Sequence, residues 1–156
     1  MGYELGRLAA FAVQRFDSGH PYSAEGDIDP RLTATNPGYV LNQLPSAPYY
    51  FSARGAFRTE DVLSTDVSLQ YDIALRAAHV FVKGDVLNAF NRAAVVAPNT
   101  DVETPRNTAG LAIFNPFTQV PVAGVNYRLS PNFGKPTGPE SYQTPRTFQI
   151  AIGARF

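Results

Sequence analysis

The most constraining feature of this chain is a strict alternation of apolar and polar side chains between Thr65 and Leu75. From Val67 onward the odd positions are apolar, whereas the even positions carry Asp, Ser, Gln, Asp and Ala. Successive side chains of a β-strand point to opposite faces, so this segment predicts a strand with one apolar and one polar face.

Three further segments complete the expected strands. Residues 78–88 alternate in the same way after the short connection Arg76-Ala77-Ala78, so 64–76 and 78–88 predict a hairpin. A strand is also expected over 3–16, although apolar residues at both odd and even positions leave a short buried helix open there. The last expected strand is 146–156, and its apolar face would consist of Phe148, Ile150, Ile152, Ala154 and Phe156.

Proline marks the segments between these strands. All 13 prolines fall within 17–63 and 89–145. A proline cannot donate a hydrogen bond to a strand ladder, so both windows are expected to be long loops. Their aromatic residues could bind a ligand, but packing of the loops against themselves is the favoured use for Tyr22, Tyr49, Tyr50, Phe51, Phe114, Phe117, Tyr127 and Tyr142.

The composition excludes several classes of function. The chain has 13 basic and 13 acidic residues, so no charge excess favours nucleic acid as a partner. It has no cysteine, which excludes disulfides, thiolate metal sites and a thiol nucleophile. There is no apolar run of about 18 residues that would predict a transmembrane helix, and the first residues lack the order of a signal peptide.

Long loops alternating with one tight turn are typical of an outer-membrane barrel, whose strands span the bilayer in about 9 to 11 residues. The fold class predicted is all-β: an antiparallel transmembrane β-barrel fragment of about four strands, with two long extracellular loops and one short periplasmic turn. A soluble secreted β-sandwich that binds carbohydrate or protein through aromatic loops is the alternative. In the barrel interpretation the lipid-facing residues are Val67, Leu69, Tyr71, Ile73, Leu75, Val80, Val82 and Val86.

Acidic residues around His20 are of the type that could ligate a hard metal ion. Asp17, Glu25, Asp27 and Asp29 lie close to His20 in sequence, but their spacing fits neither a calcium loop nor a zinc motif. A solvated polar loop is therefore expected, with no metal and no cofactor. No nucleophile, acid/base pair or phosphate loop is recognisable, so the sequence does not predict an enzyme.

Four segments resemble the C-terminal part of TonB-dependent outer-membrane receptors of the Oar-like subgroup, whose members carry a carboxypeptidase-regulatory-like domain. One is D-V-L-N-A-F-N, which is similar to the "N-L-F-N" ending of a late barrel strand in these receptors. The segments are 85–91, 49–62 with the T-D-V-S-L-Q-Y that follows, 114–128 and 131–148.

This resemblance implies a fragment of a gated receptor in the outer membrane of a Gram-negative cell, taking up an unidentified ligand. Such barrels have about 22 strands around a plug, so the chain alone would not transport, and Met1 would be an internal or misassigned start. The implied partners are outer-membrane lipid, the rest of the barrel and plug, the barrel-assembly machinery and, through the plug alone, TonB. The implied assembly signal is Phe148, Ile150, Ile152, Ala154 and Phe156, with Ala154 where the family commonly has a larger residue.

Overall fold

The computed structural model describes residues 2–5, 7–33, 46–75 and 78–155. The chain forms two compact units. The sheet unit comprises Met1–Gly19, Glu60–Val96 and Glu140–Phe156, and the loop unit comprises His20–Thr59 and Ala97–Pro139. All named strands pair antiparallel, which confirms the all-β antiparallel class. None of the described segments is a helix with the length and apolar character needed to cross a membrane.

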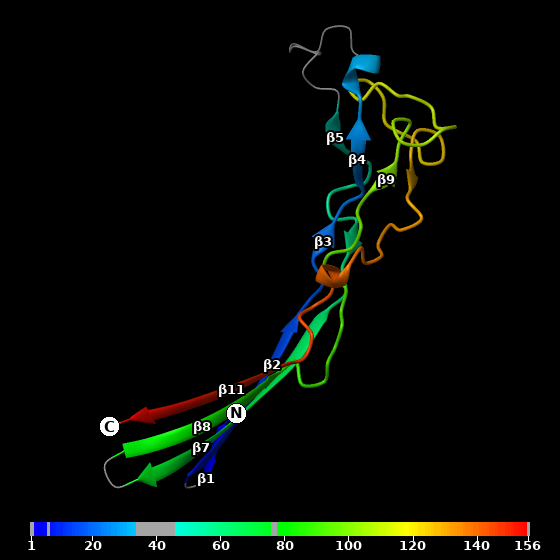
Figure 1. Ribbon diagram of the computed structural model, residues 1–156. Coiled ribbons are helices and arrows are strands. Elements are labelled where there is room, and N and C mark those ends of the chain that lie inside the picture. Colours follow the sequence, from blue (N-terminus) through cyan, green and yellow to red (C-terminus); the bar gives the residue numbers. More distant parts are fainter. Residues whose placement is uncertain (1, 6, 34–45, 76–77, 156) are drawn as a thin grey trace. The chain divides into compact units, whose positions relative to one another are not determined.

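The sheet unit is a five-stranded antiparallel sheet in the order β1-β2-β7-β8-β11 (Figure 1). Among the described strands, β1 and β11 each have a neighbour on one side only, so the sheet is open and does not close into a barrel. The strands of this sheet are β1 (Gly2–Leu5), β2 (Leu8–Asp17), β7 (Val62–Leu75), β8 (Ala78–Leu87) and β11 (Thr147–Arg155).

Three of the expected strands correspond to one element each: 64–76 to β7, 78–88 to β8 and 146–156 to β11. Residues 76–77 of the expected tight turn lie outside the described residues. Pairing of β7 with β8 runs from Val67 opposite Val86 to Leu75 opposite Ala78, so the two strands are the arms of a hairpin.

The strand expected over 3–16 has to be corrected, because the structure has two strands there. β1 and β2 pair antiparallel with Leu5 opposite Leu8, and Arg7 lies in a turn. The sequence carries a signal for this turn, since Arg7 interrupts the apolar series and both odd and even positions are apolar after it. The sheet therefore has five strands instead of about four.

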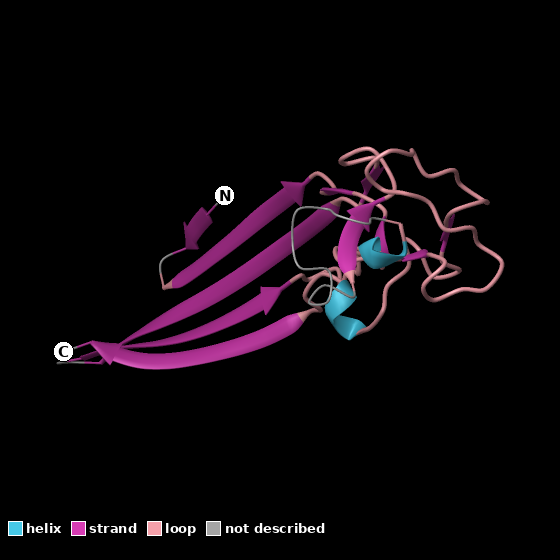
Figure 2. Cartoon of the chain, turned by 90° about the horizontal axis from the view of Figure 1, so that it is seen from above, coloured by secondary structure: helices cyan, strands magenta, loops and turns pink. Residues whose placement is uncertain are grey.

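The loop unit is built from short paired strands, which were not predicted because proline-rich segments were expected to be loops. β3 (Pro21–Tyr22) pairs with β6 (Phe57–Arg58), and β4 (Glu25–Ile28) pairs with β5 (Ala47–Tyr50). β9 (Val102–Glu103) pairs with β10 (Arg128–Leu129). The 3-10 helices η1 (Pro30–Leu32) and η3 (Pro139–Ser141) are cyan in Figure 2.

An aromatic core holds the loop unit together. Its buried apolar residues are Ala24, Phe51, Val102 and Phe114, and the Phe51 ring centroid lies 4.7 Å from that of Tyr127. The windows expected as loops therefore contain a core of their own. Packing was predicted correctly for Tyr49, Phe51, Phe114 and Tyr127. It was wrong for Tyr50, Phe117 and Tyr142, which are exposed.

Candidate functional site

The cross-strand register divides the sheet unit into two faces, because directly opposed residues of antiparallel strands share a face. Val67 lies opposite Val86, and Tyr71 lies opposite Val82. We call the surface that carries them the apolar face. All of the residues expected to face lipid lie on it by register: Val67, Leu69, Tyr71, Ile73, Leu75, Val80, Val82 and Val86.

The last strand extends the apolar face to the edge of the sheet. Phe148 lies opposite Val86, and Ile152 lies opposite Val82. By the same register Ile150 and Ala154 belong to this face, whereas Phe156 lies outside the described residues. The residues implied as an assembly signal and those expected to face lipid thus form one continuous surface.

The apolar face is the more exposed side of the sheet. Ile150 is 79% exposed and Leu69 is 50% exposed. Between Asp66 and Asp72 the exposure alternates, with apolar residues exposed and polar residues half-buried. Antiparallel sheets of water-soluble proteins have the reverse arrangement, with the apolar side against the core. Large exposed apolar surfaces of this kind mark sites of contact with a membrane or with another protein.

The opposite surface, the polar face, carries groups that pair with one another. The Lys83 ammonium lies 2.9 Å from Oδ1 of Asp85. Nε2 of Gln70 donates to Oδ2 of Asp72 at 3.0 Å. These polar groups pair with each other along their own strands, so the face is suited to a polar, water-containing space.

Strand β2 departs from this division. Phe11 lies opposite Ser68 and Val13 lies opposite Asp66, so two exposed apolar side chains of β2 stand on the polar face. Phe81 of β8, opposite Asp72, stands on the same face. Leu8 of β2 lies opposite Tyr71 on the apolar face, but Gln14, opposite Thr65, is a polar residue on that face.

A buried asparagine ties the end of β8 to two other segments. Asn88 is 4% exposed and its backbone N–H donates to Oδ1 of Asp66 at 2.8 Å. Its Nδ2 donates to the carbonyls of Arg92 at 2.8 Å and Thr144 at 2.9 Å. Its Oδ1 accepts from the N–H of Arg92 at 3.0 Å. Every side-chain polar atom of Asn88 is thereby used, which fixes where β8 stops and where the chain approaches β11.

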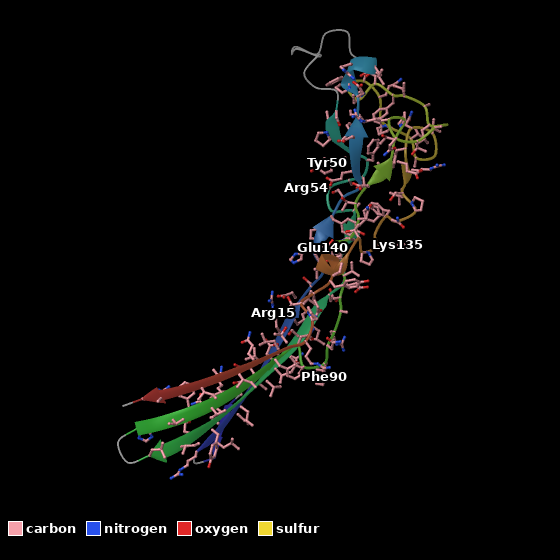
Figure 3. All side chains as sticks on the ribbon, viewed as in Figure 1. Arg15, Tyr50, Arg54, Phe90, Lys135 and Glu140 are labelled. Atoms are coloured by element: carbon pink, nitrogen blue, oxygen red, sulfur yellow. The ribbon has the colours of Figure 1, made fainter. Side chains whose placement is uncertain are left out.

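Asn91 completes the turn that follows β8. Asn88 and Asn91 have φ of 48° and 50°, in the left-handed region that asparagine tolerates. Oδ1 of Asn91 accepts from the N–H of Arg146 at 3.0 Å, just before β11 begins. The turn leaves Phe90 74% exposed (Figure 3). Residues 88–91 thus form a turn whose two asparagines hold the start of β11 in place by hydrogen bonds, and whose Phe90 side chain is exposed.

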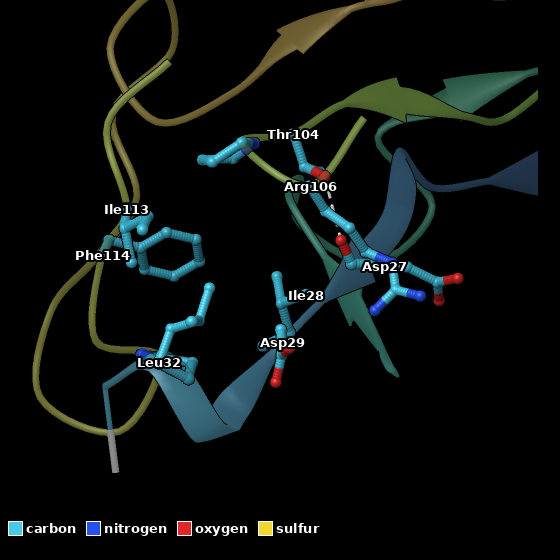
Figure 4. Close-up of a pocket in the computed structure, with 10 residues that line it drawn as sticks. Asp27, Ile28, Asp29, Leu32, Thr104, Arg106, Ile113 and Phe114 are labelled. Carbon is cyan, nitrogen blue, oxygen red and sulfur yellow. Dashed lines mark hydrogen bonds between the residues drawn. The ribbon is translucent and has the colours of Figure 1, made fainter. Parts of the chain in front are cut away.

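The loop unit contains a small, mainly apolar cavity of about 90 Å³ (Figure 4). Ile28, Leu32 and Phe114 line it, and Asp29 lies at its rim. Asp29 caps η1 and accepts hydrogen bonds from Arg31 through both carboxylate oxygens. The Arg31 guanidinium lowers the pKa of Asp29 from 3.8 to about 2.

The acidic residues near His20 do not assemble into a metal centre. Within 7–33, 46–75 and 78–155, no group of three His, Cys, Asp or Glu side chains could hold an ion. Oε1 of Glu25 accepts from the Thr100 hydroxyl at 3.0 Å, and Asp17 pairs with Arg15.

The described geometry therefore offers two functional features: the apolar face of the sheet unit, and the surface of the aromatic loop unit. The first was anticipated from alternation, whereas the second depends on pairing between distant segments. Comparison with protein-family models, curated proteins and solved structures found no match to this chain.

Proposed function

We propose that the sheet unit is a segment of the wall of an outer-membrane β-barrel, part of a TonB-dependent, Oar-like receptor that takes up an unidentified ligand. One observation carries the proposal: an exposed apolar surface runs across β2, β7, β8 and β11, and the opposite face of the sheet carries polar groups that pair with one another. A barrel wall needs this combination, because one side meets lipid and the other meets the lumen. The four sequence segments that resemble such receptors support the choice of family.

Strand length supports the same proposal. β2 and β8 each have 10 residues and β11 has 9. A tilted transmembrane strand needs about 9 to 11 residues. β7 has 14 residues and would extend beyond the hydrocarbon region.

The open edges of the sheet call for further strands. β1 and β11 each pair on one side only within the described part of the chain. In hydrocarbon each unpaired backbone group costs several kcal/mol, so spanning sheets must close. We therefore assign the sheet to a larger barrel, with the rest of that barrel, its plug and the assembly machinery as partners. TonB would engage the plug and not this sheet.

The proposal assigns roles to both units. The sheet unit anchors the receptor in the outer membrane of a Gram-negative cell. The loop unit belongs to the ligand-binding surface, and no catalytic step or cofactor is assigned to either unit. A sheet with free edges does not transport by itself, so uptake requires the whole receptor.

Folding into lipid tests this proposal. The purified chain is diluted from urea into buffer alone or into vesicles of outer-membrane lipid, and strand content and vesicle flotation are measured. We expect the sheet to form with vesicles, with its free edges pairing between chains, and to float with them after alkaline washing, because the apolar face then leaves water. A folded monomer in buffer without lipid, with the Leu69 amide protected from hydrogen exchange by a soluble core, would instead support the β-sandwich alternative.

A further inference from the structure

Two neighbouring tyrosines of β5 are used in opposite ways. The Tyr49 ring packs in the core, with its centroid 5.0 Å from Phe51 and 5.4 Å from Phe114. Tyr50 points the other way and is 66% exposed. Among the described residues, no ring contact or hydrogen bond engages the Tyr50 side chain. Its flat face is therefore available to a ligand.

A tight turn presents an arginine beside this tyrosine. The N–H of Ala56 donates to the carbonyl of Ala53 at 3.2 Å, and Gly55 has φ of 67°, so Arg54 occupies the second position of the turn. The N–H of Gly55 also donates to Oγ of Ser23 at 2.9 Å, which anchors the turn to the segment between β3 and β4. Within the part of the chain that the structure describes, no carboxylate pairs with Arg54.

Tyr50 and Arg54 line the same basin, which has a volume of about 640 Å³ (Figure 3). Pairing of β4 with β5 places Glu25 opposite Tyr50, and Glu25 lines the basin together with Thr100. The Glu25 carboxylate is already engaged by the Thr100 hydroxyl. Glu25 keeps its negative charge in this hydrogen bond but forms no ion pair with Arg54, so among the described residues the Arg54 cation of the basin has no carboxylate partner.

We infer that this basin binds an oligosaccharide that carries carboxylate groups, with a sugar ring on Tyr50 and a carboxylate on Arg54. An exposed tyrosine offers a flat apolar face and a polar hydroxyl, which suits a pyranose ring. The Arg54 fork can hold a carboxylate through two parallel hydrogen bonds. The basin lies within the usual volume range of about 300 to 1,000 Å³ for ligand sites, and Glu25 and Thr100 supply partners for sugar hydroxyls.

Aromatic rings beside hydrogen-bonding side chains favour a glycan in this basin over an acidic peptide. The lining consists of Pro21, Tyr22, Ser23, Glu25, Tyr50, Arg54, Gly55 and Thr100. The basin lies wholly within the loop unit, so binding itself does not depend on the membrane proposal. The inference rests on the proposed function only where it gives the loop unit the role of a receptor surface.

Calorimetric titration of the full chain in detergent micelles tests the inference with trigalacturonate and maltotriose, an acidic and a neutral trisaccharide. We expect trigalacturonate to bind about tenfold more tightly at low salt. The preference should shrink as salt rises, because the Arg54 contact is exposed and screened.

Variants separate the two contacts. Arg54→Gln should weaken trigalacturonate binding about tenfold and leave maltotriose unchanged, whereas Tyr50→Ala should weaken both. The matched controls are Arg92→Gln and Phe117→Ala, which alter an arginine and an aromatic residue that do not line the basin. Both controls should bind as the unaltered chain does.

Three results would overturn the inference: no binding of trigalacturonate at millimolar concentration, an unchanged preference in Arg54→Gln, or tighter binding of tetraglutamate than of trigalacturonate. Vesicle flotation of the same preparation tests the membrane proposal independently of glycan binding. A chain that floats but does not bind contradicts the glycan site alone, whereas a chain that binds but does not float contradicts the membrane assignment alone.

Discussion

The Phe81 ring lies over Gly153, directly across the pairing of β8 with β11. A Cβ atom added to Gly153 would lie 2.4 Å from two ring carbons, closer than any non-bonded contact allows. The Arg155 guanidinium adds a contact at 5.5 Å from the ring centroid. The glycine thus leaves room for an aromatic ring that covers the β8–β11 ladder.

Gly153→Val should therefore destabilise the sheet, by about 1 to 3 kcal/mol, because Phe81 must leave its position. The measurement is the free energy of urea unfolding in detergent micelles. Gly84→Val is the matched control, since a Cβ atom at Gly84 meets nothing within 4 Å. Equal losses in the two variants would contradict the contact between Phe81 and Gly153.

Replacement of Asn88 by Ala should lower the free energy of unfolding by about 1 to 3 kcal/mol, since buried partners lose their hydrogen bonds. Two effects add there, namely the lost amide contacts and the φ of 48°. Asn88→Gly separates them, because glycine keeps the backbone conformation at no steric cost. Asn88→Gly should be less destabilising than Asn88→Ala, and the reverse order would exclude backbone strain as a factor.

The pKa of Asp29 should depend on Arg31. In the folded chain this pKa is about 2, below the ordinary 3.8, because Arg31 hydrogen-bonds the charged carboxylate. The resulting stabilisation is complete above pH 3.8 and is lost as the pH falls toward 2. Titration followed by NMR should show the pKa of Asp29 moving back toward 3.8 in Arg31→Gln. An unchanged pKa would exclude the Arg31 hydrogen bond as its cause.

Charge should be tolerated on one face of β7 and not on the other. Leu69→Arg places a cation on the apolar face and should cost about 2 to 4 kcal/mol of folding free energy in vesicles if it lies near the bilayer midplane. Gln70→Arg, one residue along on the polar face, should cost less than about 1 kcal/mol. Similar losses for both variants would contradict a lipid-facing side.

Local patterns predicted the sheet unit well for physical reasons. Alternation from Val67 to Leu75 assigns each side chain of β7 to a face, and a hairpin then brings Val86 opposite Val67. The turn at Arg7 could not be predicted from alternation, because odd and even positions are both apolar from Leu8 to Val13 and Arg7 is the only interruption.

The loop unit could not be predicted in the same way. Its pairs join segments far apart in sequence, such as Glu25 with Tyr50 and Val102 with Leu129, and each strand is too short to show a period. The exposed position of Tyr50 follows from this pairing and not from its neighbours. Asn88 stood within a recognisable segment, but its hydrogen bonds depend on Asp66 and Thr144, which no local pattern brings together.

The apolar face of the sheet should meet lipid and the polar face should meet water. The chain has no cysteine, so single cysteines at 147–152 and 154 can each carry one nitroxide label. Position 153 is left unchanged, because a side chain there would displace Phe81. In vesicles, collision rates with oxygen and with a water-soluble nickel complex are measured at each position. We expect alternation, with oxygen favoured at 148, 150, 152 and 154 and nickel favoured at 147, 149 and 151. Uniform access of the nickel complex to all seven labels would contradict a lipid-facing side.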